Sequence, residues 1–354
     1  MAARLAAEIL GLGAVTPVGL TAGATAAAVR AGITRLRESS IHDKYVAPLV
    51  TGFLDEAEVP PLLAVLAAPL EAATERHRRM VRLAAPALQE AARGLTHRVP
   101  LLLALPEAPP WGDPVHEGFL GHLVEQSGVA LDVKQSQVLR LGRAGSLVAV
   151  ERALELLATR RVPTLLVGGV DTYRDARLLA MLDAEGRLHN GPLPDGLIPG
   201  EGAAFLLLGR PGEGQRQGLP VLGQLLGGGS GAEPGHRYSE EPYLGEGLSQ
   251  AFRSLFERVQ AQSSRVRCVY TGFNGERFWT KEWGVAYLRH ARHFEEGVRI
   301  EHPVESMGDL GAALGGVMVM LAATGLRKGY REGPCLVWCS SDREERAAVL
   351  VDGA

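Results

Sequence analysis

The sequence predicts an α/β fold made of two halves with similar organisation. Apolar runs of strand length alternate with longer stretches of helical periodicity, and this order occurs twice along the 354 residues. Several of the apolar runs end in glycine. In each half a helix is followed by a short arginine-containing turn and an apolar strand that ends in glycine, at 159–168 and at 264–272, which suggests an internal duplication. We therefore expect layers of helices on mainly parallel sheets.

The first half begins and ends with a buried strand. Apolar runs bounded by glycine or proline predict strands, and apolar or small residues at helical spacing predict helices. The predicted elements are a strand over 8–14, helices over 22–31 and 77–93, a strand over 99–105, a helix over 145–159, and strands over 163–167 and 203–208.

The second half repeats this rhythm after a segment rich in Gly, Pro and Gln at 209–218, which is typical of a surface linker. Its predicted elements are a strand over 221–227, a helix over 245–261, a strand over 266–271, a helix over 307–325, and strands over 335–340 and 347–351. We predict an N-terminal half over 1–210 and a C-terminal half over 219–354.

Composition excludes several classes of function. A net charge of −3 creates no field that would gather nucleic acid. Residues 1–5 lack the apolar core of a signal peptide, and the longest apolar stretch, 311–326, is too short to span a bilayer. We expect a cytoplasmic protein that binds neither membranes nor nucleic acid.

The three cysteines lie in or beside apolar runs, so buried, reduced thiols are expected. Cys335 and Cys339 have a C-x₃-C spacing, but a second Cys or His pair that would complete a zinc site is missing. We predict no metal and no cofactor.

A turn-rich run over 190–196 precedes a carboxylate between two glycines, Glu201. Glycines at this point imply a close approach of the backbone, with neighbouring amides fixing the carboxylate. A structural role is favoured because no second titratable group lies beside it in the sequence.

Four motifs in order resemble the β-ketoacyl synthase branch of the thiolase-like superfamily. Residues 11–19 are similar to the opening strand and turn of that family, and 144–169 to its nucleophile-bearing helix and following strand. Residues 196–208 resemble its GF-x-x-GEGA strand, and 306–315 its GH-x-x-GAAG helix. The resemblance implies a thiolase-like fold, with two duplicated βαβαβ-type halves that form a layered αβαβα sandwich.

This sequence departs from the family's pattern at the positions of its catalytic residues. Its nucleophilic Cys matches Arg143, and its two His match Asn274 and Asp309. The lysine expected shortly before the second His is missing. The family's C-terminal Gly-rich loop matches 340–346, a charged, helix- or turn-like run. The resemblance therefore implies that this chain has no catalytic set.

Decarboxylative condensation needs a thiolate to carry the acyl group and donors aimed at the developing negative charge. Arg143 stays protonated and cannot act as that nucleophile, and a carboxylate at Asp309 would repel an enolate. A buried guanidinium needs an anionic partner, because an unpaired buried charge is very costly. We predict an ion pair between Arg143 and Asp309, with Asn274 hydrogen-bonded beside it.

Other candidate residues could form a residual pocket: Ser146, Glu201, Glu276 and Lys281. Ser146 is not part of a G-x-S-x-G elbow, and no motif places a histidine beside it. The segment 274–283 holds two tryptophans that we expect to pack inward, whereas structural and functional roles stay open for Glu276 and Lys281. The histidines at 77, 97, 116, 122, 236, 290 and 293 are expected at the surface.

Two classes of function remain. The first is a catalytically inactive, dimeric scaffold or adaptor with a protein partner. Ketosynthases pair through the strand before the nucleophile, here 135–141 (Gln135 to Leu141), which implies a homodimer. Residues 196–201 and 308–313 resemble a degenerate ketosynthase-like subset associated with bacterial type VI secretion gene clusters, which implies loading of effector or spike proteins. The alternative is an acyltransferase or condensing-type enzyme on acyl thioesters with non-standard residues. Whether a small acyl ligand binds stays open.

Overall fold

The computed structural model describes residues 6–190, 195–259 and 265–354. The first five residues, positions 191–194 of the predicted turn-rich run and positions 260–261 at the end of a predicted helix lie outside the described residues.

The molecule contains a ten-stranded sheet with the strand order β10-β9-β11-β12-β8-β1-β7-β6-β4-β5. Its strands are β1 (Ala7–Val15), β4 (Leu101–Leu105), β5 (Gln137–Arg140), β6 (Thr164–Thr172), β7 (Glu201–Gly209), β8 (Gly223–Ala232), β9 (Val266–Tyr270), β10 (Phe294–Glu301), β11 (Cys335–Ser340) and β12 (Glu345–Asp352). A separate hairpin consists of β2 (Arg37–His42) and β3 (Pro48–Thr51).

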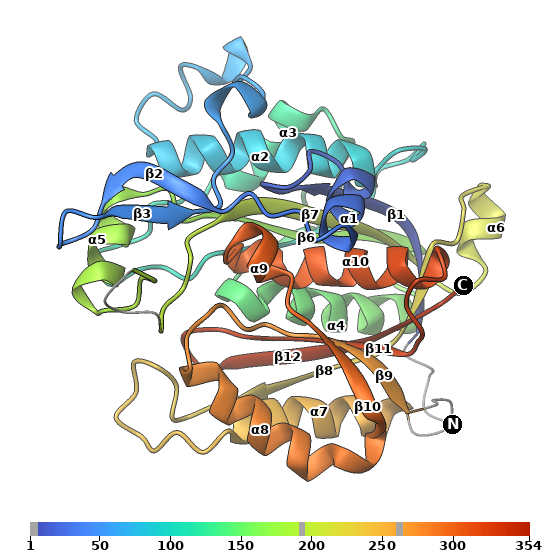
Figure 1. Cartoon of the computed structure of the whole chain (residues 1–354). Helices are drawn as coiled ribbons and strands as arrows, with labels where there is room; N and C mark the ends of the chain where they lie inside the picture. The colour runs from blue at the N-terminus through green and yellow to red at the C-terminus, as the bar shows by residue number, and fades with distance from the viewer. Residues whose placement is uncertain (1–5, 191–194, 260–264) are drawn as a thin grey trace.

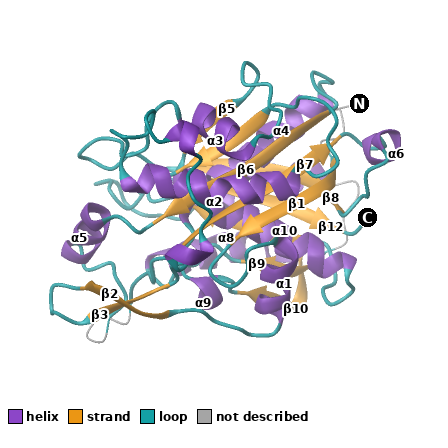
Figure 2. Ribbon diagram, turned by 90° about the horizontal axis from the view of Figure 1, so that it is seen from above, coloured by secondary structure: helices purple, strands orange, loops and turns teal. Residues whose placement is uncertain are grey.

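Helices cover both faces of this sheet (Figure 2). They are α1 (Ala22–Arg30), α2 (Glu75–Ala91), α3 (Phe119–Ser127), α4 (Gly145–Ala158), α5 (Ala176–Ala184), α6 (Glu213–Gln217), α7 (Glu246–Val259), α8 (Phe278–His290), α9 (Val304–Met307) and α10 (Leu314–Arg327). Short 3₁₀ turns occur at η1 (Glu56–Glu58), η2 (Ala64–Leu66), η3 (Gly142–Ala144), η4 (Ala291–His293) and η5 (Gly311–Ala313).

The two halves of the sheet have the same pairing scheme. In the first half, β1 pairs antiparallel with β7, and β7 pairs antiparallel with β6. Strand β4 pairs parallel with both β6 and β5. In the second half, β8 likewise pairs antiparallel with β12, and β12 with β11, while β9 pairs parallel with both β11 and β10. A short antiparallel contact between Ala7–Ile9 and Gly223–Leu225 joins the halves. The predicted linker contains α6, and the domain boundary there stays a prediction.

Five layers are visible in Figure 1, as expected for an αβαβα sandwich. Helices α2 and α3 cover the first half of the sheet, α4 and α10 lie between the halves, and α7 and α8 cover the second half. The two middle helices are buried on almost every side, which explains their nearly uniform apolar sequences. The prediction of an α/β fold with αβαβα layers is thus confirmed.

The helix predicted over 307–325 is wrong in its first turns. Backbone φ angles of 78° at Gly308 and 51° at Gly311 interrupt it, so α9, η5 and α10 follow one another instead. An added Cβ at Gly311 would lie 2.0 Å from an oxygen of Asp171, so glycine is required there. This break places Asp309 outside any helix, where its side chain is free to point into the space between the halves.

Within the part of the chain that the structure describes, no helix is long and apolar enough to cross a membrane. The cysteine prediction is confirmed, because Cys268, Cys335 and Cys339 are all unpaired and buried.

Candidate functional site

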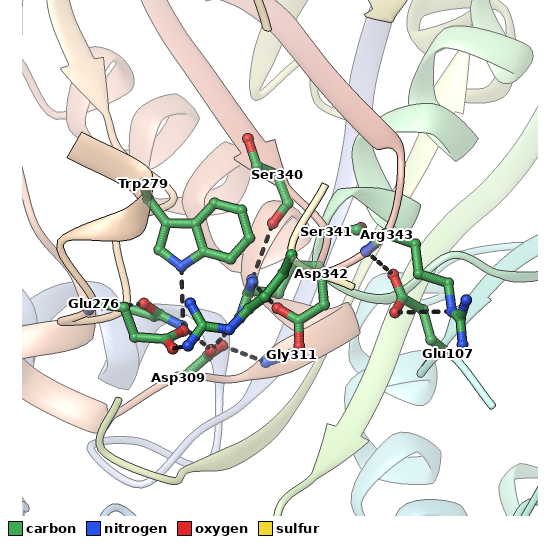
Figure 3. A network of polar contacts seen from close by, with 12 residues as sticks. Glu107, Glu276, Trp279, Asp309, Gly311, Ser340, Ser341, Asp342 and Arg343 are labelled. Atoms are coloured by element: carbon green, nitrogen blue, oxygen red, sulfur yellow. Dashed lines mark hydrogen bonds and ion pairs between the residues drawn. The ribbon is translucent and has the colours of Figure 1, made fainter. Parts of the chain in front are cut away.

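Four turns that are far apart in the sequence meet between the two halves of the sheet. Arg143 lies in η3 directly before α4, Asp309 lies between α9 and η5, Asn274 follows β9, and Asp342 lies in the turn between β11 and β12. Figure 3 shows Asp309 and Asp342 in this network together with Glu276 and Trp279 of α8. The three positions singled out from the sequence are therefore neighbours.

Arg143 is almost fully buried, with 4 % of its side chain exposed. Its Nη1 donates to Asp309 Oδ2 at 2.9 Å, its Nη2 to Asp342 Oδ1 at 2.5 Å and its Nε to the carbonyl of Ser340 at 3.0 Å. The guanidinium carbon also lies 4.5 Å from the centre of the Trp279 ring. Every nitrogen of this guanidinium has an acceptor, so its charge is compensated inside the protein.

Asp309 is completely buried and has four donors. Its Oδ2 accepts hydrogen bonds from Arg143, from the Tyr173 hydroxyl at 3.1 Å and from Asn274 Nδ2 at 3.1 Å. Its Oδ1 accepts the N–H of Gly311 at 2.8 Å. The expected ion pair, with Asn274 beside it, is present.

The ion pair belongs to a larger network. Glu276 Oε1 lies 2.9 Å from Arg187 Nε and 3.0 Å from Arg237 Nη2, and Asn274 Nδ2 donates to its Oε2 at 2.9 Å. Arg187 also donates to Asp342 at 2.8 Å. Three guanidinium groups (Arg143, Arg187, Arg237) therefore face three carboxylates (Asp309, Asp342, Glu276). The buried charges balance.

The network shifts the pKa values of its members. Burial alone would raise the pKa of Asp342, but Arg143 and Arg187 outweigh this effect and hold that pKa well below its usual range. Burial likewise opposes ionisation of Glu276, and hydrogen bonds from Arg187 lower its pKa. Burial would lower the pKa of Arg143, but Asp342 and Asp309 raise it well above the usual value. These shifts favour the charged forms of Asp342, Glu276 and Arg143.

A cavity of about 350 Å³ lies beside this network. Its polar lining includes Arg76, Glu107, Arg143, Asp171 and Asp342, and its apolar lining comes from a proline-rich loop and from α5. Arg143 thus separates the cavity from the fully buried Asp309.

The residues predicted as a residual pocket do not assemble into one, and none of them lines this cavity. Ser146 is buried in α4, where its hydroxyl donates to the carbonyl of Ala312. Glu201 is buried at the start of β7 against Arg79, and Lys281 is exposed on α8 with its Nζ 2.9 Å from the carbonyl of Tyr243. Only Glu276 belongs to the central network. These residues were grouped on their local motifs alone, and such motifs do not indicate how far apart the residues lie in the folded protein.

The expectation that the histidines lie at the surface is wrong for His77 and His290, which are buried. His77 Nδ1 accepts the N–H of His116 at 3.0 Å, and its Nε2 lies 3.0 Å from His122 Nδ1. Burial, together with His122 and His116, lowers the pKa of His77 to about 4, so this ring is neutral. Its hydrogen bonds to backbone and histidine are what permit its burial.

Trp279 is fully buried and Trp283 is partly buried, so the inward packing predicted for both is confirmed. Sequence reasoning missed Arg187, Tyr173 and Asp342 as members of the site. The charged run 340–346 was a signal for Asp342, but nothing in the local pattern around Arg187 points to the site.

The side chains of this centre carry guanidinium, carboxylate, amide and phenol groups. The nearby thiol of Cys339 is fully buried, and burial raises its pKa above the usual range, so it does not form a thiolate. Among the described residues, no group of three or more His, Cys, Asp or Glu side chains could hold a metal ion.

No protein-family model and no curated protein sequence matches this chain. Solved structures match it over nearly its whole length, and they establish the ketosynthase-type, thiolase-like fold. The ishigamide ketosynthase/chain length factor has a TM-score of 0.79 at 14 % identity and covers 99 % of this chain and 100 % of its own.

Two further structures are similar. The ketosynthase from module 6 of the bacillaene synthase from Bacillus subtilis 168 has a TM-score of 0.80 at 16 % identity, over 98 % of this chain and 72 % of its own. The AntDE:AntF structure is a type II PKS acyl-carrier protein in complex with its ketosynthase bound to the hexaketide. It has a TM-score of 0.76 at 14 % identity and covers 99 % of this chain and 100 % of its own. At such identities the likeness establishes the fold and no activity.

Proposed function

We propose that this chain is a non-condensing protein with a ketosynthase-type fold, which acts as a dimeric scaffold or adaptor. The observation that supports the proposal is the Arg143–Asp309 ion pair, at 2.9 Å and with side-chain exposures of 4 % and 0 %. It occupies the positions at which the sequence resemblance puts the nucleophilic Cys and a His. A guanidinium held by two carboxylates cannot carry an acyl group, and the carboxylates disfavour an enolate.

One assay decides between this proposal and an enzyme with altered residues. The protein is incubated with acyl- and malonyl-thioesters, and intact mass and CO₂ release are measured. We expect an unchanged mass and CO₂ release equal to the buffer blank. The alternative, an acyltransferase or condensing-type enzyme on acyl thioesters, gains support from the cavity beside Arg143. A covalent acyl adduct or catalysed decarboxylation would establish that alternative and refute a non-condensing role.

A homodimer through the segment 135–141 is part of the proposal. Strand β5 is the last strand in the order of the sheet, so one of its edges has no partner strand among the residues that the structure describes. Val138 on this segment is 39 % exposed, and Val133, two residues before the segment, is 47 % exposed. Pairing of two β5 strands would cover both valines and continue the sheet from one copy into the other.

The adaptor role, for effector or spike proteins of a type VI secretion system in the bacterial cytoplasm, rests on the motifs at 196–201 and 308–313. A tagged copy is purified from its native host, in which an untagged copy is also expressed. This experiment tests for a second copy of the chain and for a secretion component as partners. We expect the untagged copy and a secretion component to co-purify. Val138→Lys should release the untagged copy, whereas Leu288→Lys, on the exposed face of α8, should not. Recovery of the tagged chain alone would contradict both assignments.

A further inference from the structure

The cavity beside Arg143 has one apolar and one charged side. Its apolar residues come from the loop after β4 and from α5: Pro106, Ala108, Pro109, Pro110, Leu178, Met181 and Leu182. The charged residues come from α2 (Arg76), β6 (Asp171), η3 (Arg143), the turn between β11 and β12 (Asp342 and Arg343) and, with Glu107, from the same loop after β4. A cavity of about 350 Å³ with this division suits a small molecule with a polar head and a short apolar tail.

Three carboxylates line the cavity, and two of them have close cations. Asp171 lies 2.8 Å from Arg76 Nη2, and Asp342 lies 2.5 Å from Arg143 Nη2. Glu107 differs from both. It accepts the backbone N–H of Arg343 at 3.3 Å, while the Arg343 side chain remains 3.9 Å away.

The contact between Glu107 and Arg343 is also unequal in burial. The side chain of Arg343 is 45 % exposed, whereas that of Glu107 is 17 % exposed. Water therefore screens the arginine more than the carboxylate, and an exposed pair at this distance contributes little. Of the three carboxylates in the cavity, Glu107 is therefore the one with the weakest contact to a cation.

We propose that this cavity binds a protonated primary amine with a short apolar tail, with Glu107 as the ion partner of the ammonium group and the residues of α5 against the tail. This site is independent of the proposed scaffold function, since neither requires the other.

The charges around Glu107 favour this class of ligand. Burial and the nearby Asp342 raise the pKa of Glu107 to about 7, and Glu345 acts in the same direction. The N–H of Arg343 and the charge of Arg143 oppose this rise without cancelling it. An ammonium group placed beside Glu107 would be a closer cation than the Arg343 side chain at 3.9 Å, whereas a carboxylate ligand there would meet a like charge.

Isothermal titration of the full chain with n-hexylamine, hexan-1-ol and hexanoate at pH 8 tests the head group at constant tail length. We expect hexylamine to bind most tightly, and butylamine about tenfold more weakly because two methylenes are lost. Tighter binding of hexanoate, or equal binding of all three compounds, would overturn the proposal.

Variants locate the site. Glu107→Gln keeps the size of the side chain and should weaken hexylamine binding at least tenfold, while the exposed Glu117→Gln should leave it unchanged. Met181→Trp, which fills the cavity without altering its charge, should abolish binding. If Glu107→Gln does not fold, Met181→Trp and the pH dependence of binding still test whether hexylamine binds in this cavity. Unchanged hexylamine binding in Met181→Trp would place the ligand elsewhere and refute the site.

The dependence on pH follows from competition between a proton and the ligand for Glu107. Hexylamine stays protonated at both pH 6 and pH 8, since alkylammonium groups have a pKa near that of lysine, about 10. Glu107, with a pKa of about 7, is mostly ionised at pH 8 and mostly neutral at pH 6, so binding should be about tenfold weaker at pH 6. Binding that does not change between the two pH values would contradict the assigned partner.

Discussion

Replacing Asp309 by alanine is expected to lower the free energy of unfolding by about 3–5 kcal/mol. The substitution removes the completely buried acceptor of Arg143 Nη1 and leaves part of the guanidinium charge uncompensated. The hydroxyl of Tyr173 and the amide of Asn274 also lose an acceptor in the interior. Chemical denaturation monitored by circular dichroism measures the change.

A surface ion pair provides the control for Asp309→Ala. Glu332 lies 3.1 Å from Arg267, with side-chain exposures of 80 % and 46 %, so Glu332→Ala should change the stability by less than about 1 kcal/mol. Equal losses for the two substitutions would mean that burial does not strengthen the central pair, contrary to the role assigned to it.

Glu201→Gln is expected to have a similarly large effect, a loss of about 3–5 kcal/mol. Glu201 is completely buried and accepts from Arg79 Nε and Nη2, both at 2.6 Å, from the Thr172 hydroxyl at 2.8 Å and from the N–H of Leu54 at 2.8 Å. Glutamine removes the charge and turns an NH₂ group towards donors. The free energy of unfolding at neutral pH is again the measurement.

The matched comparison uses the same cation. Glu56 lies 2.8 Å from Arg79 Nη1, but its side chain is 60 % exposed. Glu56→Gln should therefore cost no more than about 1 kcal/mol. A loss for Glu56→Gln as large as that for Glu201→Gln would show that the contact with Arg79, and not its burial, determines the energy.

Elements that are apolar along their length could be predicted from the sequence. Strand β11, predicted over 335–340, has the predicted bounds, and α4 differs from its prediction by one residue. Strand β10 was missed because it is an edge strand with one buried residue, so its sequence has neither a continuous apolar run nor a regular alternation. The glycines at 308 and 311 were present in the sequence, but the apolar pattern around them favoured one continuous helix.

The central ion pair could be predicted because two motifs fixed the positions of Arg143 and Asp309. The partners beyond them could not. Arg187 and Asp342 are 155 residues apart in the sequence, and Arg143 and Asp342 are 199 residues apart. Likewise, the carboxylate of Glu201 was expected to be held by neighbouring amides, but its main partner is Arg79 of α2, 122 residues away. The hydrophobic periodicity of a helix or strand indicates which of its faces is buried, but not which side chains of other elements contact that face.

A double-mutant cycle on Arg143 and Asp309 tests most directly whether the two residues neutralise each other in place of a reactive centre. Arg143→Met, Asp309→Ala and the double variant are compared with the parent by chemical denaturation. If the charges compensate each other, the double variant should lose at least about 2 kcal/mol less than the sum of the single losses. Losses that add to within about 0.5 kcal/mol would contradict a mutually neutralising pair.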